Sequence, residues 1–335
     1  MIDTSNLVSA LNEKMKDIIT QVITGPIISN IEVISTNIPQ VDSALGIGGI
    51  PLGRIIEIYG AEMSGKSTLA IHIAAEVIRE GGFVLYIDGE HALDPKYAEL
   101  IGCSMGSFII SQPDCAEQAW SVIENFIDLA REEDVDSPLL IIYDSLIALS
   151  PKKELEGEPG DQTIGLLARL IGQNLRRLTG KLSKQNATMI FINQLRDKIG
   201  LMGFGKPTDT PGGKAVKYFS SLRLELIKKS IDEESDCFLV EMKVTKNKMA
   251  PPYKLARIWL EFNKGFMIDR AWLDWAVLNG LIKKNKSWYV IPGLNGADDI
   301  KFQGYNKWKK IFNEDREGWM SRLDEIEFSK QESER

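Results

Sequence analysis

The chain has 335 residues, of which 44% are hydrophobic and 26% charged, and its formal net charge is -7. This composition supports a packed core and excludes a disordered chain, while the negative charge excludes a protein that coats nucleic acid with its whole surface and allows only a local basic groove. The apolar runs fall short of the roughly 20 residues of a membrane-spanning helix, and no signal peptide opens the chain.

The cysteines point to the same kind of protein. Cys103, Cys115 and Cys237 are odd in number, far apart and without a CxxC pair, so neither a disulfide framework nor a zinc site can be read from them. A reducing compartment suits such a chain. We therefore expect a cytoplasmic protein with no membrane partner.

The first segment carries the pattern of an amphipathic helix. Apolar residues recur at spacings of three and four from Leu7 to Ile23, and Gly25 followed by Pro26 ends the pattern. We therefore expect residues 1–32 to form an N-terminal helical arm.

Two further segments follow the arm. Over residues 33–264, short runs rich in β-forming residues alternate with helical stretches, which is typical of an α/β core with a mostly parallel sheet flanked by helices. Residues 265–335 differ in composition and predict a small α+β C-terminal domain with a short tail. This last segment holds five of the seven tryptophans, namely Trp272, Trp275, Trp288, Trp308 and Trp319.

The clearest chemical signal in the core is residues 60–67. Gly60, four intervening residues and then Gly65, Lys66 and Ser67 match the phosphate-binding loop, which chance gives a chain of this length about one time in a hundred. The pattern lies between a predicted strand and a predicted helix, the setting that its mechanism needs. Backbone N–H groups then face phosphate oxygens, Lys66 reaches the β and γ phosphates, and Ser67 ligates Mg²⁺.

A phosphate loop also needs an acid near the metal and a group that aligns water. Residues 139–143 predict a buried strand, and Asp144 stands at its carboxyl end, where α/β sheets place ligand contacts. Asp144 is therefore the expected magnesium acid, acting through water. Residues 83–87 repeat the pattern, followed by Asp88 and Glu90, and spacing alone does not choose which of these two polarises the attacking water.

Six stretches of the chain form a recognisable set: "GAEMSGKST", "YIDGEHALDPKYA", "SQPDCAEQA", "ELEGEPGDQTIGLLAR", "FINQLRDKIG" and "VTKNKMAPPY". In this order they closely resemble the bacterial RecA recombinases, and the resemblance covers residues 33–262 almost continuously. It implies a RecA-type phosphate-loop ATPase core and a DNA-dependent ATPase that uses ATP and Mg²⁺. It also implies a helical filament on single-stranded DNA that pairs homologous duplex DNA and exchanges strands in recombination, repair and the SOS response to DNA damage.

Carried over residue by residue, the resemblance makes Glu90 the water-activating carboxylate and leaves Asp88 a structural neighbour. Gln194 becomes the γ-phosphate sensor that also begins the second DNA-binding loop. Asp94 would hold the adenine, and Tyr97 would stack on it. The set implied for the nucleotide is Gly60, Glu62, Ser64, Gly65, Lys66, Ser67, Thr68, Asp94, Tyr97 and Asp144, with Ser67 and Asp144 on the metal.

Three lysines gather within residues 243–248. Such a cluster, taken alone, is most simply a basic strand end facing water. The resemblance instead implies that Lys246 and Lys248 reach across the filament interface to the ATP of the next subunit, where an extra cation stabilises phosphoryl transfer. Lys243 is then a solvated bystander.

The resemblance places DNA along two loops. Residues 156–163, Gly-rich and acidic, would contribute backbone N–H groups together with Arg169 and Arg176 on one face of the following helix. Residues 196–213 combine glycines, cations and apolar side chains, which suits a polyanion of any sequence, although composition alone fits a solvated surface loop equally well. The expected contacts of this second loop are Arg196, Lys198, Met202, Phe204, Gly212 and Gly213.

Outside the core the resemblance is weaker. Residues 1–32 are expected to act as an oligomerisation arm that docks on the next subunit. Near the other end, Lys283, Lys284 and Lys286 beside Trp288 either receive incoming duplex DNA or form a solvated charged turn. We expect a short tail of mixed charge in place of the long acidic tail of the family.

Two other functions stay open from the sequence. A ring-forming DNA motor of related core fold would share the phosphate loop and Asp144, but it would not be expected to carry the stretches at 90–98 and 244–248. A nucleotide-switched DNA-coating scaffold with little turnover would keep the same site, because motif identity does not fix a rate. A repressor or mediator protein is a further candidate partner, and the sequence does not separate a main recombinase from an accessory or phage version.

Overall fold

The computed structural model describes residues 31–133, 136–158, 165–197, 208–232, 236–293 and 298–333. The chain divides into two compact units, Met1–Glu32 and Val33–Arg335, and almost all of the described residues belong to the second. The predicted helix of residues 7–23 lies outside the described residues, as do residues 159–163 of the first DNA loop and residues 198–207 of the second.

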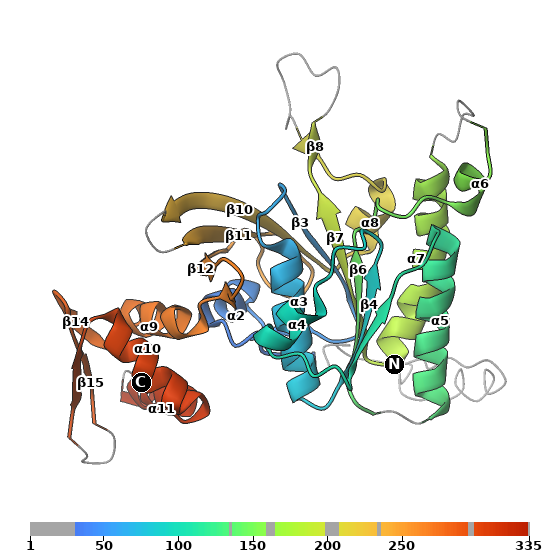
Figure 1. Cartoon of the computed structure of the whole chain (residues 1–335). Coiled ribbons are helices and arrows are strands. Elements are labelled where there is room, and N and C mark those ends of the chain that lie inside the picture. Colours follow the sequence, from blue (N-terminus) through green and yellow to red (C-terminus); the bar gives the residue numbers. More distant parts are fainter. Residues whose placement is uncertain are drawn as a thin grey trace, which may run out of the picture. The chain divides into compact units, whose positions relative to one another are not determined.

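Among the described residues, nine strands form a central sheet in the order β13-β12-β11-β10-β3-β7-β6-β4-β5 (Figure 1). The six strands from β10 to β5 in this order are parallel, and β11, β12 and β13 extend the sheet in antiparallel fashion. The prediction of a mostly parallel sheet is therefore confirmed. The strands are β3 (Ile55–Gly60), β4 (Phe83–Asp88), β5 (Phe108–Ser111), β6 (Leu139–Asp144), β7 (Ala187–Gln194), β10 (Leu222–Asp232), β11 (Cys237–Asn247), β12 (Leu255–Glu261) and β13 (Gly265–Phe266).

The central strands are apolar because both of their faces are covered. Every residue of β3 and of β6 is buried. Parallel strands between two helical layers read as continuous apolar runs for this reason. Within β3 the exception is Glu57, a carboxylate with no exposed surface in the middle of the run.

Helices cover both faces of the sheet (Figure 1). Two separate apolar clusters show the two layers: α3 (Lys66–Arg79) and α4 (Pro95–Ile101) contribute to one, and α5 (Ala116–Glu132) and α7 (Leu166–Lys184) contribute to the other. The stripe on α5 follows the helical period, with Ala116, Ala119, Trp120, Ile123 and Ile127 buried. No helix in the described ranges is long and apolar enough to span a bilayer.

Short elements connect these layers. Of these, α2 begins at a proline in its first turn and ends at Gly46 in the left-handed conformation, which is a common way to start and stop a helix. The short elements are β1 (Val33–Ile34), α2 (Pro39–Leu45), β2 (Ile50–Pro51), α6 (Lys152–Leu155), β8 (Arg196–Asp197), β9 (Thr208–Asp209) and α8 (Lys214–Phe219).

The described residues after β13 form three helices and a three-stranded antiparallel sheet. Trp308 is fully buried there, its Nε1 donates to the carbonyl oxygen of Asp269 at 2.6 Å, and the Phe302 ring stacks between Trp308 and Tyr289. A separate domain from residue 265 onward stays a prediction. The elements are α9 (Ile268–Leu278), β14 (Lys283–Asn285), β15 (Trp288–Ile291), β16 (Ile300–Gln303), α10 (Tyr305–Glu314) and α11 (Arg316–Ser333).

Glu76 lies where this last part of the chain meets the core. Its carboxylate is 5% exposed near the end of α3, and it accepts hydrogen bonds from Asn37 and Arg79. Arg316, the first residue of α11, lies 4.0 Å from the same carboxylate. The last helix of the chain therefore contacts the helix that follows the phosphate loop.

Candidate functional site

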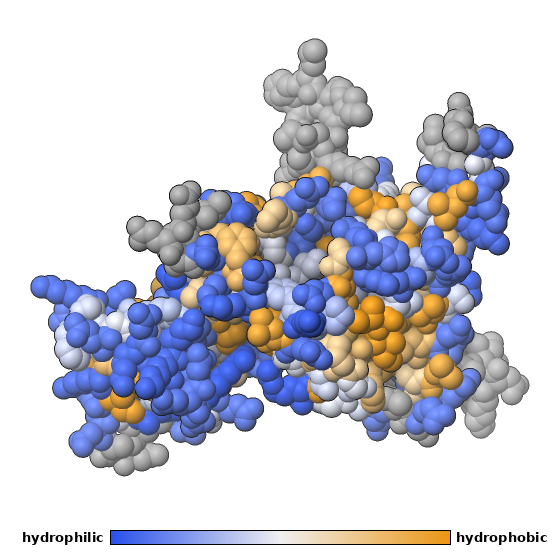
Figure 2. Space-filling model, in the orientation of Figure 1, coloured by the Kyte–Doolittle hydropathy of each residue, from blue (hydrophilic) through white to orange (hydrophobic). Residues whose placement is uncertain are grey.

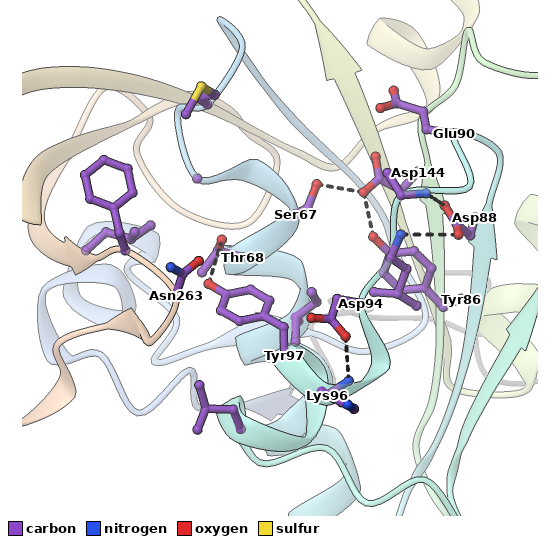
Figure 3. Close-up of a pocket in the computed structure, with 18 of the residues that line it drawn as sticks. Ser67, Thr68, Tyr86, Asp88, Glu90, Asp94, Lys96, Tyr97, Asp144 and Asn263 are labelled. Atoms are coloured by element: carbon purple, nitrogen blue, oxygen red, sulfur yellow. Dashed lines mark hydrogen bonds between the residues drawn. The ribbon is translucent and has the colours of Figure 1, made fainter. Parts of the chain in front are cut away.

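A cavity of about 730 Å³ opens at the carboxyl ends of the parallel strands (Figure 3). Its walls come from α3, α4, the loop after β4, the end of β6, and β11 and β12. This is the edge at which α/β sheets bind ligands. The lining residues are Met63, Gly65, Ser67, Thr68, Ile71, Tyr86, Asp88, Glu90, Ala92, Leu93, Asp94, Lys96, Tyr97, Leu100, Asp144, Phe238, Leu260, Phe262 and Asn263.

The phosphate loop joins β3 to α3, as predicted. A Cβ atom on Gly60 would lie 2.2 Å from the carbonyl oxygen of Leu226, so only glycine fits the end of β3. Gly65 takes a φ of 91° directly before the first turn of α3, and no side chain caps the helix N–H groups. Ser64 Oγ is buried without a hydrogen-bond partner among the described residues. Free backbone donors and an unpaired buried hydroxyl fit the phosphates of a nucleotide.

Lys66, at the end of this loop, contacts a backbone oxygen and lies near three carboxylates. Lys66 donates from its ammonium group to the carbonyl oxygen of Ala61 at 2.7 Å. Burial lowers the pKa of Lys66, against the nearby carboxylates of Asp144, Glu90 and Glu62, which raise it. Glu62 itself lies exposed on the loop. A lysine held in this way has its charge beside the cavity with a backbone oxygen as its partner.

Ser67 and Asp144 are in direct contact at the floor of the cavity. Ser67 Oγ donates to Asp144 Oδ2 at 2.7 Å, and the hydroxyl of Tyr86 donates to the same oxygen at 2.5 Å (Figure 3). Burial raises the pKa of Asp144 above its usual value, while the hydrogen bonds from Tyr86 and Ser67 lower it. A serine hydroxyl beside a buried carboxylate is a donor set that suits Mg²⁺.

Asp88 and Glu90, which the spacing did not separate, differ in their contacts. Asp88 is buried and accepts hydrogen bonds from the backbone N–H groups of Ala92 and Leu93 and from the side chain of Gln112. Its carboxylate therefore holds the loop that follows β4.

Glu90 is exposed on the cavity wall. It accepts a hydrogen bond from the hydroxyl of Ser145 and another from Nε2 of Gln194 at 3.4 Å. The structure thus brings Glu90 and Gln194 together beside the Ser67–Asp144 pair. An exposed carboxylate with a hydroxyl to orient it can accept a proton.

One side of the cavity is suited to a flat ring. Tyr97 lies on α4 and shares a hydrogen bond of 3.3 Å with the Thr68 hydroxyl (Figure 3). Asp94 caps α4, with one carboxylate oxygen accepting from the N–H of Lys96 at 2.9 Å. The apolar side chains around them are Leu93, Leu100, Phe238, Leu260 and Phe262.

Several lining residues were missed by the sequence reasoning. Tyr86 stands in the stretch "YIDGEHALDPKYA" but was given no role, and Phe262 and Asn263 had no motif to mark them. The strand β12 that ends just before Phe262 lies more than 150 positions from the phosphate loop, and an apolar residue in a strand gives no sign that it faces a cavity. Asn263 has a φ of 59°, a conformation in which asparagine is common, but this too is visible only in the structure.

Lys246 and Lys248 are not among the residues that line this cavity in the described chain. The ammonium group of Lys246 donates to the carbonyl oxygens of Lys217 at 2.7 Å and Tyr218 at 3.0 Å, and that of Lys248 donates to the Tyr218 carbonyl at 3.4 Å. Both lysines therefore contact the C-terminal end of α8, a favourable place for cations. Burial lowers the pKa of Lys246, with smaller effects of the same sign from the positive charges of Lys248 and Arg223.

The predicted DNA contacts fall in two groups. Arg169 and Arg176 are exposed on α7, and Nε of Arg176 donates to the Gly172 carbonyl oxygen at 3.0 Å. Arg196 begins β8, and Gly212 and Gly213 precede α8 with φ angles of 87° and 77°. Lys198, Met202 and Phe204 lie outside the described residues.

The fold and this site define a phosphate-loop nucleoside triphosphatase of the α/β class. A family model described as the RecA N-terminal domain matches residues 10–267. Protein RecA of Clostridium novyi (strain NT) is 48% identical over 263 residues, which are 78% of this chain and 73% of that protein. Protein RecA of Chlorobium limicola (strain DSM 245 / NBRC 103803 / 6330) is 44% identical over 294 residues, 87% of this chain and 81% of that protein. The chain belongs to the RecA family.

Family membership decides the class of activity. The chain is an ATP-dependent DNA recombinase that acts in recombination and repair, and it is a DNA-dependent ATPase. Membership also implies nucleotide binding, DNA binding and filament formation. The resemblance described from the six stretches is confirmed, and the ring-forming motor and the scaffold are disfavoured.

Proposed function

We propose that the cavity binds ATP with Mg²⁺ and that residues 60–67 hold the phosphates. The observation that carries this proposal is the hydrogen bond between Ser67 and Asp144 beside the uncapped start of α3, because these oxygens suit a metal next to a nucleotide. Asp144 acts through water. Bound Mg²⁺ would supply charge neutralisation at the β and γ phosphates.

The base of ATP is proposed to lie between α4 and the β11–β12 side of the cavity. Tyr97 would stack on the adenine, and Asp94 would accept a hydrogen bond from its amino group. Support comes from the apolar side chains that gather there together with the Tyr97 ring. Thr68, bonded to the Tyr97 hydroxyl, would keep the ring in place.

Glu90 is proposed to accept the proton of the attacking water. Its exposed carboxylate is oriented by the Ser145 hydroxyl, which suits a general base. Lys66 is proposed to exchange the Ala61 carbonyl for the γ-phosphate. Gln194 would exchange its bond to Glu90 for one to the same phosphate, so that the nucleotide state changes the start of the second DNA loop.

Lys246 and Lys248 are proposed to act on the ATP of the neighbouring subunit in the filament. An extra cation stabilises the charge that develops on the transferred phosphoryl group. The two ammonium groups would leave the end of α8 for this contact.

DNA is proposed to lie along Arg169, Arg176 and the second loop. The cations Arg196 and Lys198 would pair with phosphates, and Met202 and Phe204 would wedge between bases. Gly212 and Gly213 would bring backbone N–H groups close to the chain of the nucleic acid.

Duplex DNA is proposed to approach the basic edge of β14. Lys283 and Lys284 are exposed, and Trp288, which pairs with Asn285 from the neighbouring strand β15, is 50% exposed, as basic and aromatic groups at a DNA surface would be. Figure 2 draws this last part of the chain as mostly hydrophilic.

The remaining assignments follow from this activity. Residues 1–32 are proposed as the oligomerisation arm, 33–264 as the ATPase and DNA-binding core, and 265–335 as a small C-terminal domain. A filament of this kind also offers a surface to repressor or mediator proteins. We propose the cytoplasm as its location because DNA, its substrate, is there.

The first test is ATP hydrolysis with and without single-stranded DNA. We expect DNA to stimulate turnover of the full chain, and Lys66→Ala to reduce turnover by about a hundredfold or more, because the cation beside the γ-phosphate is removed. Negative-stain images of the same samples should show helical filaments.

Two outcomes would contradict the proposal. Filaments with turnover no higher than that of Lys66→Ala would indicate a DNA-coating scaffold, and rings in place of filaments would indicate a motor. Strand exchange between homologous oligonucleotides then follows as the direct assay of recombination.

A further inference from the structure

Glu57 is a buried carboxylate that the proposed chemistry leaves without a role. It lies in β3, three residues before the phosphate loop begins, and none of its surface is exposed. Burying a carboxylate costs free energy unless charged and hydrogen-bonding partners compensate it. Glu57 has two such partners, because Asn193 donates to Oε1 at 3.0 Å and Arg223 donates from Nε to Oε2.

Asn193 connects Glu57 to both ends of the second DNA loop. The side-chain amide of Asn193 also donates to the carbonyl oxygen of Pro211 at 3.0 Å, and its side-chain oxygen accepts from the N–H of Gln194 at 3.0 Å. Gln194 precedes the loop and Pro211 follows its last strand, β9. Asn193, held by Glu57, therefore joins the two stems of the loop, which are Gln194 before it and residues 210–211 near its end.

Arg223 makes a second connection to the same loop. Its guanidinium donates to the Thr210 hydroxyl at 3.4 Å and lies 4.6 Å from the centre of the Tyr59 ring. A guanidinium that is paired, bonded and stacked in this way has little freedom to move. The carboxylate of Glu57 thus orders both contacts to the second stem, through Asn193 and through Arg223.

The network also reaches the strand end that carries the lysines. Arg223 in β10 lies opposite Lys246 in β11. The register of the two strands shifts next to these residues, so that Thr245 forms a β-bulge. The Thr245 hydroxyl accepts a hydrogen bond from the Tyr59 hydroxyl at 2.9 Å and donates to the Arg223 carbonyl oxygen at 3.2 Å. The direction of Lys246 after the bulge therefore depends on the same cluster.

We infer that Glu57 is a positioning residue that couples DNA at the second loop to the nucleotide. The inference rests on the proposed function, since it takes the loop as a DNA site and Gln194 and Lys246 as groups that act on ATP. Glu57 touches neither ligand. It holds the two loop stems, Gln194 and the strand before Lys246 in one arrangement, so a shift of the stems on DNA binding is passed to both phosphate-contacting side chains.

The test measures this coupling. The affinity of a fluorescein-labelled oligo-dT for the full chain is measured with ADP and with a slowly hydrolysed ATP analogue. The dissociation constant with ADP divided by the dissociation constant with the analogue is the coupling factor. Glu57→Gln keeps the side-chain volume and removes the charge that orders Arg223. We expect Glu57→Gln to lower the coupling factor at least about tenfold, toward 1, and to change the affinity of the protein for ADP by no more than about threefold.

Glu241→Gln is the matched control. Glu241 is also a shielded carboxylate of this sheet and pairs with Lys229 and Arg257, which are not part of the network around Glu57. Thr210→Val is a second variant, because it removes the hydroxyl that Arg223 contacts and leaves the buried ion pair in place. It should lower the coupling factor in the same direction and by less than Glu57→Gln.

The outcomes separate the inference from the proposed function. Wild type with a coupling factor well above 1 and both variants within twofold of Glu241→Gln would overturn the inference and leave the function standing. If the affinity of the wild type for DNA is the same with ADP and with the ATP analogue, both the inference and the proposed function are overturned. If circular dichroism shows that Glu57→Gln does not fold, Thr210→Val is the test. A coupling factor of Thr210→Val below that of Glu241→Gln supports the inference, and an equal coupling factor overturns it.

Discussion

Asp88 ends β4 and Glu90 lies two positions further on, in the loop after β4, yet their carboxylates have different surroundings. Both oxygens of Asp88 accept hydrogen bonds from the following loop or from Gln112, whereas Glu90 is exposed and, within the described ranges, accepts from the side chains of Ser145 and Gln194. The sequence pattern of a strand followed by an acid describes both equally. Their environments separate them, because these depend on residues distant in the sequence, such as Gln112 directly after β5 and Ser145 directly after β6.

His72 allows a prediction at the same scale. It is buried on α3, its Nε2 accepts a hydrogen bond from the N–H of Phe266 at 2.9 Å, and burial, helped by the charges of Arg316 and Arg79, lowers its pKa to about 3. The unfolded chain binds a proton on this imidazole below pH 6.5 that the folded protein does not bind. The free energy of unfolding therefore falls as the pH drops from 6.5 toward 3.

At pH 5 the loss from His72 alone is about 2 kcal/mol. We expect His72→Gln, which keeps a hydrogen-bond acceptor, to lose less stability than wild type between pH 7 and 5 by about this amount. Urea unfolding at the two pH values measures it. His91→Gln, at the exposed second histidine, is the control, and equal slopes for wild type and His72→Gln would contradict the assignment.

At the scale of elements, α8 and the end of β11 form one unit. The bulge at Thr245 precedes Lys246 and Lys248, and the two ammonium groups donate to carbonyl oxygens in the last turn of α8, the helix that directly follows the second of the loops proposed to bind DNA. A lysine cluster in a sequence gives no sign of this contact, since it depends on the register of β10 and β11.

Lys248→Ala tests the role proposed for this unit. We expect DNA-dependent ATP turnover to fall on the order of 10³-fold, as when a cation supplied in trans is removed, while nucleotide binding by the isolated subunit stays nearly unchanged. Turnover with single-stranded DNA and binding of a fluorescent ATP analogue are the two readouts. Lys243→Ala, three residues before Lys246, is the matched control, and full turnover in Lys248→Ala would remove the trans role.

The elements around the phosphate loop could be predicted because their signals are local. A buried run, a glycine-rich turn and an amphipathic stretch place β3, the loop and α3 in order, and β6 is recognisable in the same way. The far wall of the cavity could not be predicted. Phe238, Leu260 and Phe262 become lining residues only through the antiparallel pairing of β11 with β12, which brings them opposite α4.

Glu57 marks the limit of the pattern reading in another way. A single acid inside the apolar run of β3 signals that a partner exists, because a carboxylate cannot be buried alone. The sequence does not say that the partners are Asn193 and Arg223, 136 and 166 positions away. Those pairings follow from the parallel neighbours of β3 in the sheet.

At the scale of the whole molecule, assembly is the property to test. Deleting residues 1–32 should abolish helical filaments and leave the affinity for a fluorescent ATP analogue within a few-fold of wild type, because the cavity is built from residues after 33. Negative-stain images with DNA and ATP analogue provide the measurement. Filaments formed by the shortened chain would refute the role proposed for the arm.

The contact of α11 with Glu76 has a consequence for anyone who trims this protein. α3 is about 21 Å long, and most of its residues are buried. The phosphate loop lies at its N-terminal end and the Glu76 carboxylate near its C-terminal end. Removing the chain from residue 316 onward would take a cation away from that buried charge. The last described helix, which contributes no residue to the lining of the cavity, thus supports the helix that begins at the phosphate loop, and a shortened protein made for crystallography should retain it.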